Sequence, residues 1–367
     1  MIYMNIIFHT PLPLNTKATS ASGIRPLKML SAFQELGYHV DLITGYSNER
    51  RKCIKQIKKN IRNGKKYDFV YSESSTMPTI LTDTHHLPLH PLTDYFFFKF
   101  CNKNNIPIGL FYRDIYWLFD SYGKNLSPLK RFIAKTSYKF DLWVYKKTLK
   151  TLYLPSTEMG KYIPTVPTEI FKTLPPGHST SNINYSSKTT LTNGNLRLFY
   201  VGGFSDHYKM HKLFDAIQQL PKVELTICTR EIEWLSAKRE YPYIPENIKI
   251  VHLSGEEMEK KLSASDITML FVEPHEYWTF ASPVKLYEYL GYQKPIISSK
   301  GTLAGSFIKN NNIGWVIPYD TNILINLLTN IINDPSQLDS IHENLKKLAP
   351  NHSWQSRAKQ VCKDLTQ

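Results

Sequence analysis

The most informative segment of the chain, residues 281–297, reads ASPVKLYEYLGYQKPII. Ser282 is a residue type that caps helices, and Pro283 suits the first helical position, so we expect a helix to begin at this pair. The amides of Val284 and Lys285 then have no partner within the helix. A helix N-terminus of this kind binds anions.

Lys285 and Glu288 lie three residues apart and therefore share one face of the predicted helix. This spacing puts a cation at the helix tip and a carboxylate one turn deeper. A nucleoside diphosphate matches the arrangement, with its phosphates at the tip and its ribose hydroxyls on Glu288. An ordinary capped helix with a solvated lysine and glutamate has the same spacing, so both interpretations stay open at this point.

Short β-branched or aromatic runs alternate with helical patterns along the rest of the chain. Among the predicted helices are residues 24–36, which end at Gly37, and residues 210–220. This alternation is typical of parallel sheets covered by helices on both faces. The predicted strands are residues 4–8, 40–44, 68–72, 108–112 and 151–154, followed by 196–202, 223–228, 248–252, 267–272 and 295–298.

The alternation stops at residues 176–195, where a Pro-Pro-Gly step leads into a polar run of serine, threonine and asparagine. We interpret this run as an interdomain linker. The 367 residues are enough for two domains. The predicted fold is α/β, with two Rossmann-like doubly wound domains facing each other across a cleft. In such sheets, ligands bind beyond the carboxyl ends of the strands.

The charge of the chain is concentrated in its first half. Lys and Arg number 45 against 31 Asp and Glu, a net charge of +14. Residues 1–160 hold 23 basic and 11 acidic residues, or +12, whereas residues 161–367 hold 22 and 20, or +2. This distribution argues against a uniformly basic nucleic-acid coat and indicates that one half faces an anionic surface or substrate. The hydrophobic content of 42% excludes a disordered chain.

Residues 283–297 resemble the donor-binding motif of GT-B glycosyltransferases, especially the family-four-like enzymes of bacterial surface polysaccharide synthesis. In that motif a P-x-K-x-x-E helix, followed by a glycine and then a P-(I/V)-(I/V) step, holds the sugar nucleotide; here the glycine is Gly291 and the step is residues 295–297. Residues 9–23 resemble the first loop of the acceptor domain, and residues 200–204 resemble the turn that opens the donor domain. Residues 352–354 resemble the start of the closing helix.

The resemblance implies an acceptor-binding domain at residues 1–175, a donor-binding domain at 196–350, and a C-terminal helix at 351–367 that crosses back to the first domain. It also implies donor contacts from the Ser282–Glu288 segment. Family-four enzymes often carry an earlier glutamate, whose place is taken here by Phe280. Retention and inversion of the anomeric centre therefore both stay open.

Four further residues are candidates for binding phosphate or donor. Gly23 permits close approach of a ligand to backbone amides, and Arg25 is placed to contact a phosphate. A plain capping turn explains this pair equally well. Arg230 follows a predicted strand on the expected diphosphate side of the donor domain, although an ordinary exposed arginine fits there too. Gly203 belongs to the turn that opens the same domain.

Asp114 is the candidate catalytic residue. It follows the buried run IGLFY at residues 108–112, and its context Arg-Asp-Ile-Tyr-Trp at residues 113–117 resembles the Arg-Asp-Leu-Trp step found in many bacterial polysaccharide glycosyltransferases. We expect its carboxylate to accept the proton of the acceptor hydroxyl or to orient the acceptor. The alternative is a structural ion pair between Arg113 and Asp114.

Neither a metal site nor a leader segment is predicted. His85, His86 and His90 lie in a proline-rich loop without the partners of a tetrahedral site, and an Asp-x-Asp motif is missing, so we expect a metal-independent reaction. The four scattered cysteines favour a reducing compartment. Residues 1–8 lack a basic leader and no apolar run reaches about 18 residues, so the expected location is cytoplasmic.

Two basic segments account for the charge excess. Residues 50–66 contain nine Lys or Arg interleaved with isoleucines, and residues 128–150 contain seven interleaved with Phe132, Phe140, Trp143 and Tyr145. Both are predicted to be amphipathic helices, apolar inward and basic outward. A solvated face is the ordinary interpretation. Binding of the first domain to an anionic inner membrane surface is the alternative that we favour.

The sequence thus predicts a glycosyltransferase that moves a sugar from a nucleotide donor, expected to be a UDP-sugar, to a glycan or a lipid-diphosphate-linked acceptor. No cofactor and no nucleic-acid partner are expected, since no nucleic-acid motif is recognised. A UDP-sugar 2-epimerase of the same fold remains an alternative. A non-catalytic protein that binds sugar nucleotides or nucleic acid is another.

Overall fold

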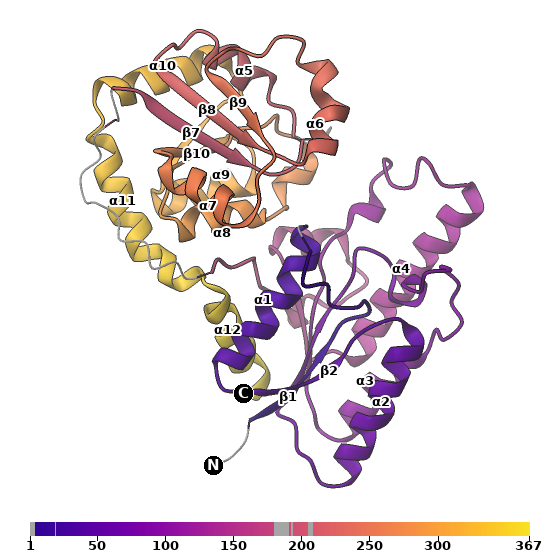
Figure 1. Cartoon of the computed structure of the whole chain (residues 1–367). Helices are drawn as coiled ribbons and strands as arrows, with labels where there is room; N and C mark the ends of the chain where they lie inside the picture. Colours follow the sequence, from indigo (N-terminus) through magenta and orange to yellow (C-terminus); the bar gives the residue numbers. More distant parts are fainter. Residues whose placement is uncertain (1–3, 19, 180–190, 192–193, 205–207) are drawn as a thin grey trace. The chain divides into compact units, whose positions relative to one another are not determined.

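The computed structural model describes residues 4–18, 20–179, 191, 194–204 and 208–367. Contacts divide the chain into two compact units, each built on one sheet (Figure 1). The first unit is Met1–Pro176 with Trp354–Gln367, and the second is Gly177–Ser353. Most of the predicted linker lies outside the described residues.

The first unit contains a six-stranded parallel sheet of order β2-β1-β3-β4-β5-β6. All five residues of β3 are buried, which requires cover on both faces. Its strands are β1 (Asn5–His9), β2 (His39–Ile43), β3 (Phe69–Glu73), β4 (Ile108–Phe111), β5 (Thr151–Leu154) and β6 (Phe171–Thr173). Its helices are α1 (Ala21–Glu35), α2 (Ser47–Arg62), α3 (Thr93–Lys103), α4 (Pro128–Thr148) and α12 (Trp354–Thr366).

The second unit repeats this design with the strand order β12-β11-β10-β7-β8-β9, again parallel. Its strands are β7 (Leu196–Val201), β8 (Val223–Cys228), β9 (Ile248–Val251), β10 (Ile267–Leu270), β11 (Ile296–Ser299) and β12 (Gly314–Ile317). Its helices are α5 (His211–Ile217), α6 (Glu231–Ala237), α7 (Gly255–Ala264), α8 (Val284–Gly291), α9 (Leu303–Asn311), α10 (Thr321–Asn333) and α11 (Gln337–Leu348).

Alternate residues of β7 show that both faces of the second sheet are covered. Leu198 and Tyr200 belong to one buried cluster, together with residues of α5 and α10, whereas Phe199 belongs to another, with residues of α8, α9 and α11. Because successive strand residues point to opposite faces, the sheet has a core on each side. The prediction of doubly wound α/β units is confirmed.

Every predicted strand is present, and β5 and β8 have the predicted bounds. Two strands were not predicted. β6 is only three residues long, and β12 starts at a glycine, pairs with β11 alone, and is half-buried throughout. Both lie at the edges of their sheets, where the buried apolar pattern that reveals a strand is weakest.

The predicted outward and inward faces of the two basic helices are partly wrong. In α2, Ile54 and Ile57 are buried as expected, but Arg50 is buried too, because it pairs with the carboxylate of Asp94. In α4, the predicted inward residues Phe132 and Trp143 are instead exposed. Helix α4 therefore carries large apolar side chains outside its buried face as well.

Candidate functional site

In the second unit, a pocket lies at the carboxyl ends of β7, β10 and β11, where the N-termini of α8 and α9 meet them. Ligands bind at this edge of a parallel sheet. The pocket measures about 20 Å³, room for a single ordered water. Its lining residues are Tyr200, Tyr208, Leu270, Val272, Trp278, Pro283, Lys285, Ser298, Thr302 and Ala304.

Helix α8 begins one residue later than predicted. Pro283 has an extended backbone, with φ −72° and ψ 137°, so it is the capping residue and Val284 is the first helical residue. The prediction that Ser282 caps the helix is wrong, because its hydroxyl lies 3.2 Å from the hydroxyl of Tyr287. Val284 and Lys285 still supply the first two amides of the helix.

The Lys285 side chain is buried between two tyrosines rather than extended into solvent. Its Nζ donates a hydrogen bond of 2.8 Å to the hydroxyl of Tyr200, which donates in turn to the carbonyl oxygen of Gly203 at 2.7 Å. The ammonium group also lies 4.3 Å and 4.2 Å from the ring centroids of Tyr200 and Tyr208. Aromatic faces attract a cation, so this cage holds the lysine in one position.

Burial sets the charge of Lys285. Removal from water lowers the pKa of its ammonium group to about 7, while the carboxylates of Glu288 and Glu233 act in the opposite direction. Glu288 lies one turn deeper on α8 and is half-buried. A lysine with this pKa gains charge readily when an anion approaches, because the anion favours the protonated form.

Gly202 is the residue that leaves room for this lysine. Its φ is +146°, a conformation that favours glycine, and a Cβ built there would lie 2.3 Å from Nζ of Lys285. A Cβ at Gly203 would lie 3.1 Å from the ring of Tyr208. Gly203, not Gly202, was the predicted residue. The Gly-Gly pair indicated the turn, but it did not reveal which glycine faces the lysine.

Two other residues of this edge were not predicted. Glu233 pairs with Arg230 and accepts a 3.0 Å hydrogen bond from the amide of Phe204. The Arg230 side chain is exposed beside β8, as predicted, but it is engaged by Glu233. Thr302 caps α9 and accepts from the amide of Gly305 at 2.9 Å. A threonine directly before a helical pattern is a capping signal.

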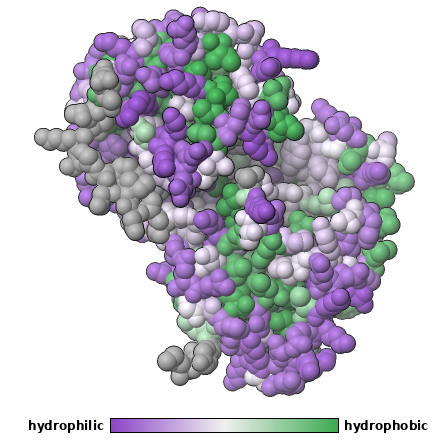
Figure 2. All heavy atoms as spheres, in the orientation of Figure 1, coloured by the Kyte–Doolittle hydropathy of each residue, from purple (hydrophilic) through white to green (hydrophobic). Residues whose placement is uncertain are grey.

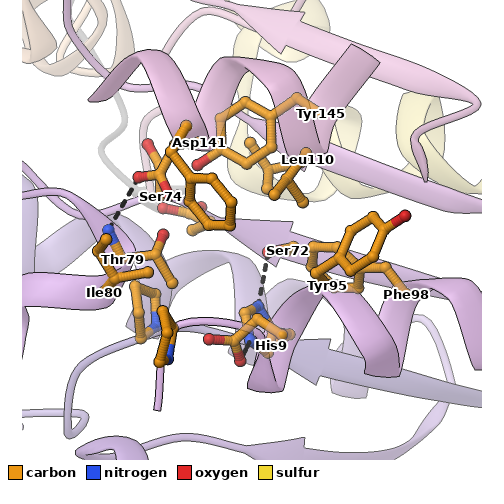
Figure 3. Close-up of a pocket in the computed structure, with 16 residues that line it drawn as sticks. His9, Ser72, Ser74, Thr79, Ile80, Tyr95, Phe98, Leu110, Asp141 and Tyr145 are labelled. Atoms are coloured by element: carbon orange, nitrogen blue, oxygen red, sulfur yellow. Dashed lines mark hydrogen bonds and ion pairs between the residues drawn. The ribbon is translucent and has the colours of Figure 1, made fainter. Parts of the chain in front are cut away.

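In the first unit, a second pocket lies at the carboxyl ends of β1, β3 and β4 (Figure 3). His9, at the end of β1, contacts Ser72 through Nδ1 at 2.7 Å and Asp94 through Nε2 at 3.1 Å. Asp94 also forms an ion pair with Arg50 at 3.0 Å. Although burial opposes it, the charges of Arg50 and His9 hold the pKa of Asp94 well below its usual range.

Asp141 of α4 faces the same pocket and has the opposite character (Figure 3). Its carboxylate accepts a 2.8 Å hydrogen bond from the amide of Thr79. Burial nevertheless raises the pKa of Asp141 to about 7. The sequence analysis did not single out this residue, because a lone aspartate in a basic amphipathic pattern carries no signal of burial.

Asp114 is half-buried after β4, but it is not among the residues that line this pocket. Its Oδ1 accepts from the amides of Ile115 at 2.7 Å and Tyr116 at 3.0 Å, which starts the short helix Tyr116–Leu118. Arg113 forms an ion pair with Glu73 at 3.0 Å. The catalytic role of Asp114 stays a prediction.

Gly23 and Arg25, the two residues predicted to bind phosphate, both have contacts within the first unit. Gly23 lies inside the first turn of α1, its amide donates to Ser20, and a Cβ there would lie 2.4 Å from that of Ala18. Arg25 is buried, 3.2 Å from Glu73 and 3.5 Å from the ring centroid of Phe111. The ion pair with Glu73 gives Arg25 a structural role, and its predicted contact with a phosphate stays a prediction.

Among the described residues, no group of three or more His, Cys, Asp or Glu is arranged to hold a metal ion. In the same part of the chain, no helix has both the length and the apolar character that crossing a bilayer requires.

Comparison with solved structures identifies the fold. HepE from Anabaena, solved in complex with UDP-glucose, is similar with a TM-score of 0.63 at 13% identity, over 99% of this chain and 100% of that one. WaaG, a glycosyltransferase involved in lipopolysaccharide biosynthesis, has a TM-score of 0.59 at 15% identity, over 98% and 99%. Sucrose-phosphate synthase from Thermosynechococcus elongatus has 0.63 at 13%, over 98% of each chain.

These similarities show that the chain has the GT-B fold, as the sequence resemblance implied. No family model and no curated protein sequence matches the chain.

Proposed function

We propose that this protein is a glycosyltransferase that uses a nucleoside diphosphate sugar, with a UDP-sugar as the donor. One observation carries the proposal. At the ligand-binding edge of the second sheet, the first amides of α8 lie beside a caged lysine, with Glu288 one turn deeper. The similarity to HepE, which was solved with UDP-glucose, supports the choice of uridine.

Each group of this site has a role in transfer. Glu288 would accept hydrogen bonds from the ribose hydroxyls. Lys285 and the amides of Val284 and Lys285 would stabilise the negative charge that develops on the diphosphate as the glycosidic bond breaks. Because the neutral and charged forms of Lys285 are balanced near neutral pH, the diphosphate would draw a proton onto Nζ when it binds. This stabilisation would make the reaction independent of a metal.

The acceptor is proposed to be a glycan or a lipid-diphosphate-linked saccharide of a surface polysaccharide, bound by the first unit. The net charge of +12 over residues 1–160 supports an anionic partner there. WaaG, a similar structure, is involved in lipopolysaccharide biosynthesis. We further propose that the protein works in the cytoplasm, peripheral to the inner face of the membrane.

A donor panel tests this proposal. Purified protein is incubated with UDP-, GDP- and ADP-sugars, with and without lipid-linked or soluble glycan acceptors, and nucleotide release is measured in excess chelator. We expect release from a UDP-sugar that depends on the acceptor and survives the chelator. Release without an acceptor, together with a changed sugar, would instead indicate an epimerase. An absolute requirement for a divalent metal would contradict the metal-independent mechanism.

Glu288→Gln links the activity to this site. The amide keeps the size of the side chain but loses the charge that accepts from two ribose hydroxyls, so we expect about tenfold weaker binding of the UDP-sugar. Glu231→Gln, on the first turn of α6, is the matched control. Equal affinities of the Glu288→Gln variant and the unchanged protein would contradict the ribose assignment.

A further inference from the structure

Helix α4 of the first unit has three faces instead of two. Successive residues of an α-helix are rotated by about 100°, so positions three and four apart share a face. One face is buried in the unit and includes Asp141 and Tyr145. The other two faces, one apolar and one basic, are both turned outward.

The apolar outward face runs along Leu129, Phe132, Ile133 and Trp143. Leu129 and Phe132 are 68% and 69% exposed, and Ile133 and Trp143 are 40% and 43% exposed. Leu126, just before the helix, is exposed as well. Figure 2 shows hydrophobic side chains reaching the surface of the first unit in the region where Figure 1 draws α4. Large apolar side chains gathered in this way mark an interaction surface.

The basic outward face lies beside the apolar one. Arg131, Lys135, Lys139 and Lys146 recur at helical spacing along it. The helix contains a single acidic residue, Asp141, and that residue is buried. Apart from Thr136, the exposed residues of α4 are thus apolar or cationic.

This composition favours a lipid surface over a protein partner. Lysine is depleted in protein–protein interfaces, whereas a helix that lies in a membrane interface combines large apolar residues with lysine and arginine. Anionic headgroups attract cations close to the bilayer surface. Helix α4 has both the large apolar residues and the basic residues that binding to such a membrane requires. Its N-terminal end is stabilised by Ser127, whose hydroxyl accepts from the amide of Lys130, and by Pro128 in the first turn.

We propose that α4 inserts Leu129, Phe132 and Ile133 into the acyl boundary of an anionic bilayer, while Arg131, Lys135 and Lys139 bind the headgroups. The inference rests on the proposed membrane-linked acceptor and specifies the surface that meets the lipid. It adds to the predicted binding of the basic first domain to an anionic membrane, because apolar side chains of α4 make the contact while its charges select the lipid.

Flotation with vesicles tests the insertion. The vesicles contain phosphatidylcholine with phosphatidylglycerol, or phosphatidylcholine alone. We expect binding to the anionic vesicles and at least a tenfold loss of binding in Leu129→Ser/Phe132→Ser. The matched control is Ile232→Ser on α6, where the original side chain is 73% exposed; it should bind as the unchanged protein does.

Tryptophan fluorescence reports the depth of α4. Lipids with brominated acyl chains should quench Trp143, and the quenching should fall in Trp143→Phe, which corrects for the other tryptophans. Equal flotation of the double variant and the unchanged protein would overturn insertion and leave attraction by charge alone. A dimer that the double variant converts to a monomer, without vesicle binding by either protein, would assign this face to a second copy of the chain.

The inference and the proposed function can fail separately. The double variant should keep its rate of transfer to a soluble acceptor, because its substitutions lie outside the donor site. Transfer without any vesicle binding by the unchanged protein would overturn the inference alone. Vesicle binding that depends on Leu129 and Phe132, in a protein that transfers no sugar, would uphold the inference and overturn the proposed function.

Discussion

The Cα of Gly202 faces the ammonium group of Lys285 so closely that a methyl group added to the glycine would lie 2.3 Å from Nζ. The contact joins the end of β7 to the first turn of α8. The lysine therefore reaches its place between Tyr200 and Tyr208 only because the chain has no side chain at position 202. The geometry of the proposed donor site thus depends on a glycine that contributes no chemical group.

Gly202→Ala should disturb this contact in two ways, by straining the backbone and by displacing the lysine. A backbone with φ +146° costs about 1–3 kcal/mol for a residue other than glycine, and the new methyl group would push Lys285 out of its cage. We expect a lower free energy of unfolding and at least tenfold weaker UDP-sugar binding, measured by denaturant titration and calorimetry. Gly64→Ala is the matched control, since its φ of +92° also favours glycine while a Cβ there would meet no heavy atom within 4 Å. Equal effects of the two substitutions would argue against the proposed contact.

The charge of Lys285 should make donor binding depend on pH. In the protein without donor, the pKa of Lys285 is about 7, and a bound diphosphate raises this pKa. At a pH between the pKa of the unbound and the bound protein, donor binding is therefore accompanied by uptake of a proton. We expect the affinity for UDP-glucose to fall by up to about tenfold per pH unit as the pH rises above 7. Calorimetry in buffers of different ionisation enthalpy would measure the proton uptake.

Lys285→Met is the companion variant for that pH profile. From about pH 7 to the usual lysine pKa of 10.5, the unfolded chain binds more protons at this residue than the folded chain, so stability rises with pH there. The methionine variant should lose this rise and the pH-dependent donor binding, yet remain folded. A steep pH dependence of donor binding that persists in Lys285→Met would show that another group takes up the proton.

The sequence predicted the elements of the fold well because buried strands in doubly wound sheets are short apolar runs separated by amphipathic helices. It failed at β6 and β12, which are edge strands with weak apolar patterns. The predicted start of α8 was one residue too early, because a proline fits both as the capping residue and as the first helical residue.

The site was harder to predict because its chemistry depends on partners distant in sequence. The Pro283–Glu288 spacing was informative, since one helix fixes it. The cage around Lys285 comes from residues 200 and 208, some eighty positions away, and nothing local indicates it. Arg25 and Asp141 illustrate the same limit. Arg25 pairs with Glu73, and Asp141 accepts from the amide of Thr79. Neither partner is adjacent in the sequence.

Asp114→Asn would separate catalysis from local structure. Asparagine keeps an oxygen that can accept from the amides of Ile115 and Tyr116, so the turn should persist, while the charge that accepts a proton is lost. If Asp114 handles the acceptor hydroxyl, transfer should fall by about 100-fold or more with unchanged affinity for the UDP-sugar. Asp114→Ala should in addition lower the free energy of unfolding by about 1 kcal/mol. Full transfer by the asparagine variant would leave Asp114 only its turn-capping role.

Asp141 should make the stability of the protein fall as the pH rises from about 4 to 7. Its pKa is about 7 in the folded chain against a usual value of 3.8, so in this interval the folded chain holds a proton that the unfolded chain has released. Asp141→Asn can still accept from the amide of Thr79 and should remove this fall, of up to about 1.4 kcal/mol per pH unit. Denaturant titrations across the interval would measure it, with the exposed Asp120→Asn as control. The slope of the free energy of unfolding against pH could instead be the same in Asp141→Asn and the unchanged protein. Asp141 would then be ionised in the folded state and would face the pocket in Figure 3 as a charged carboxylate rather than as a neutral acid.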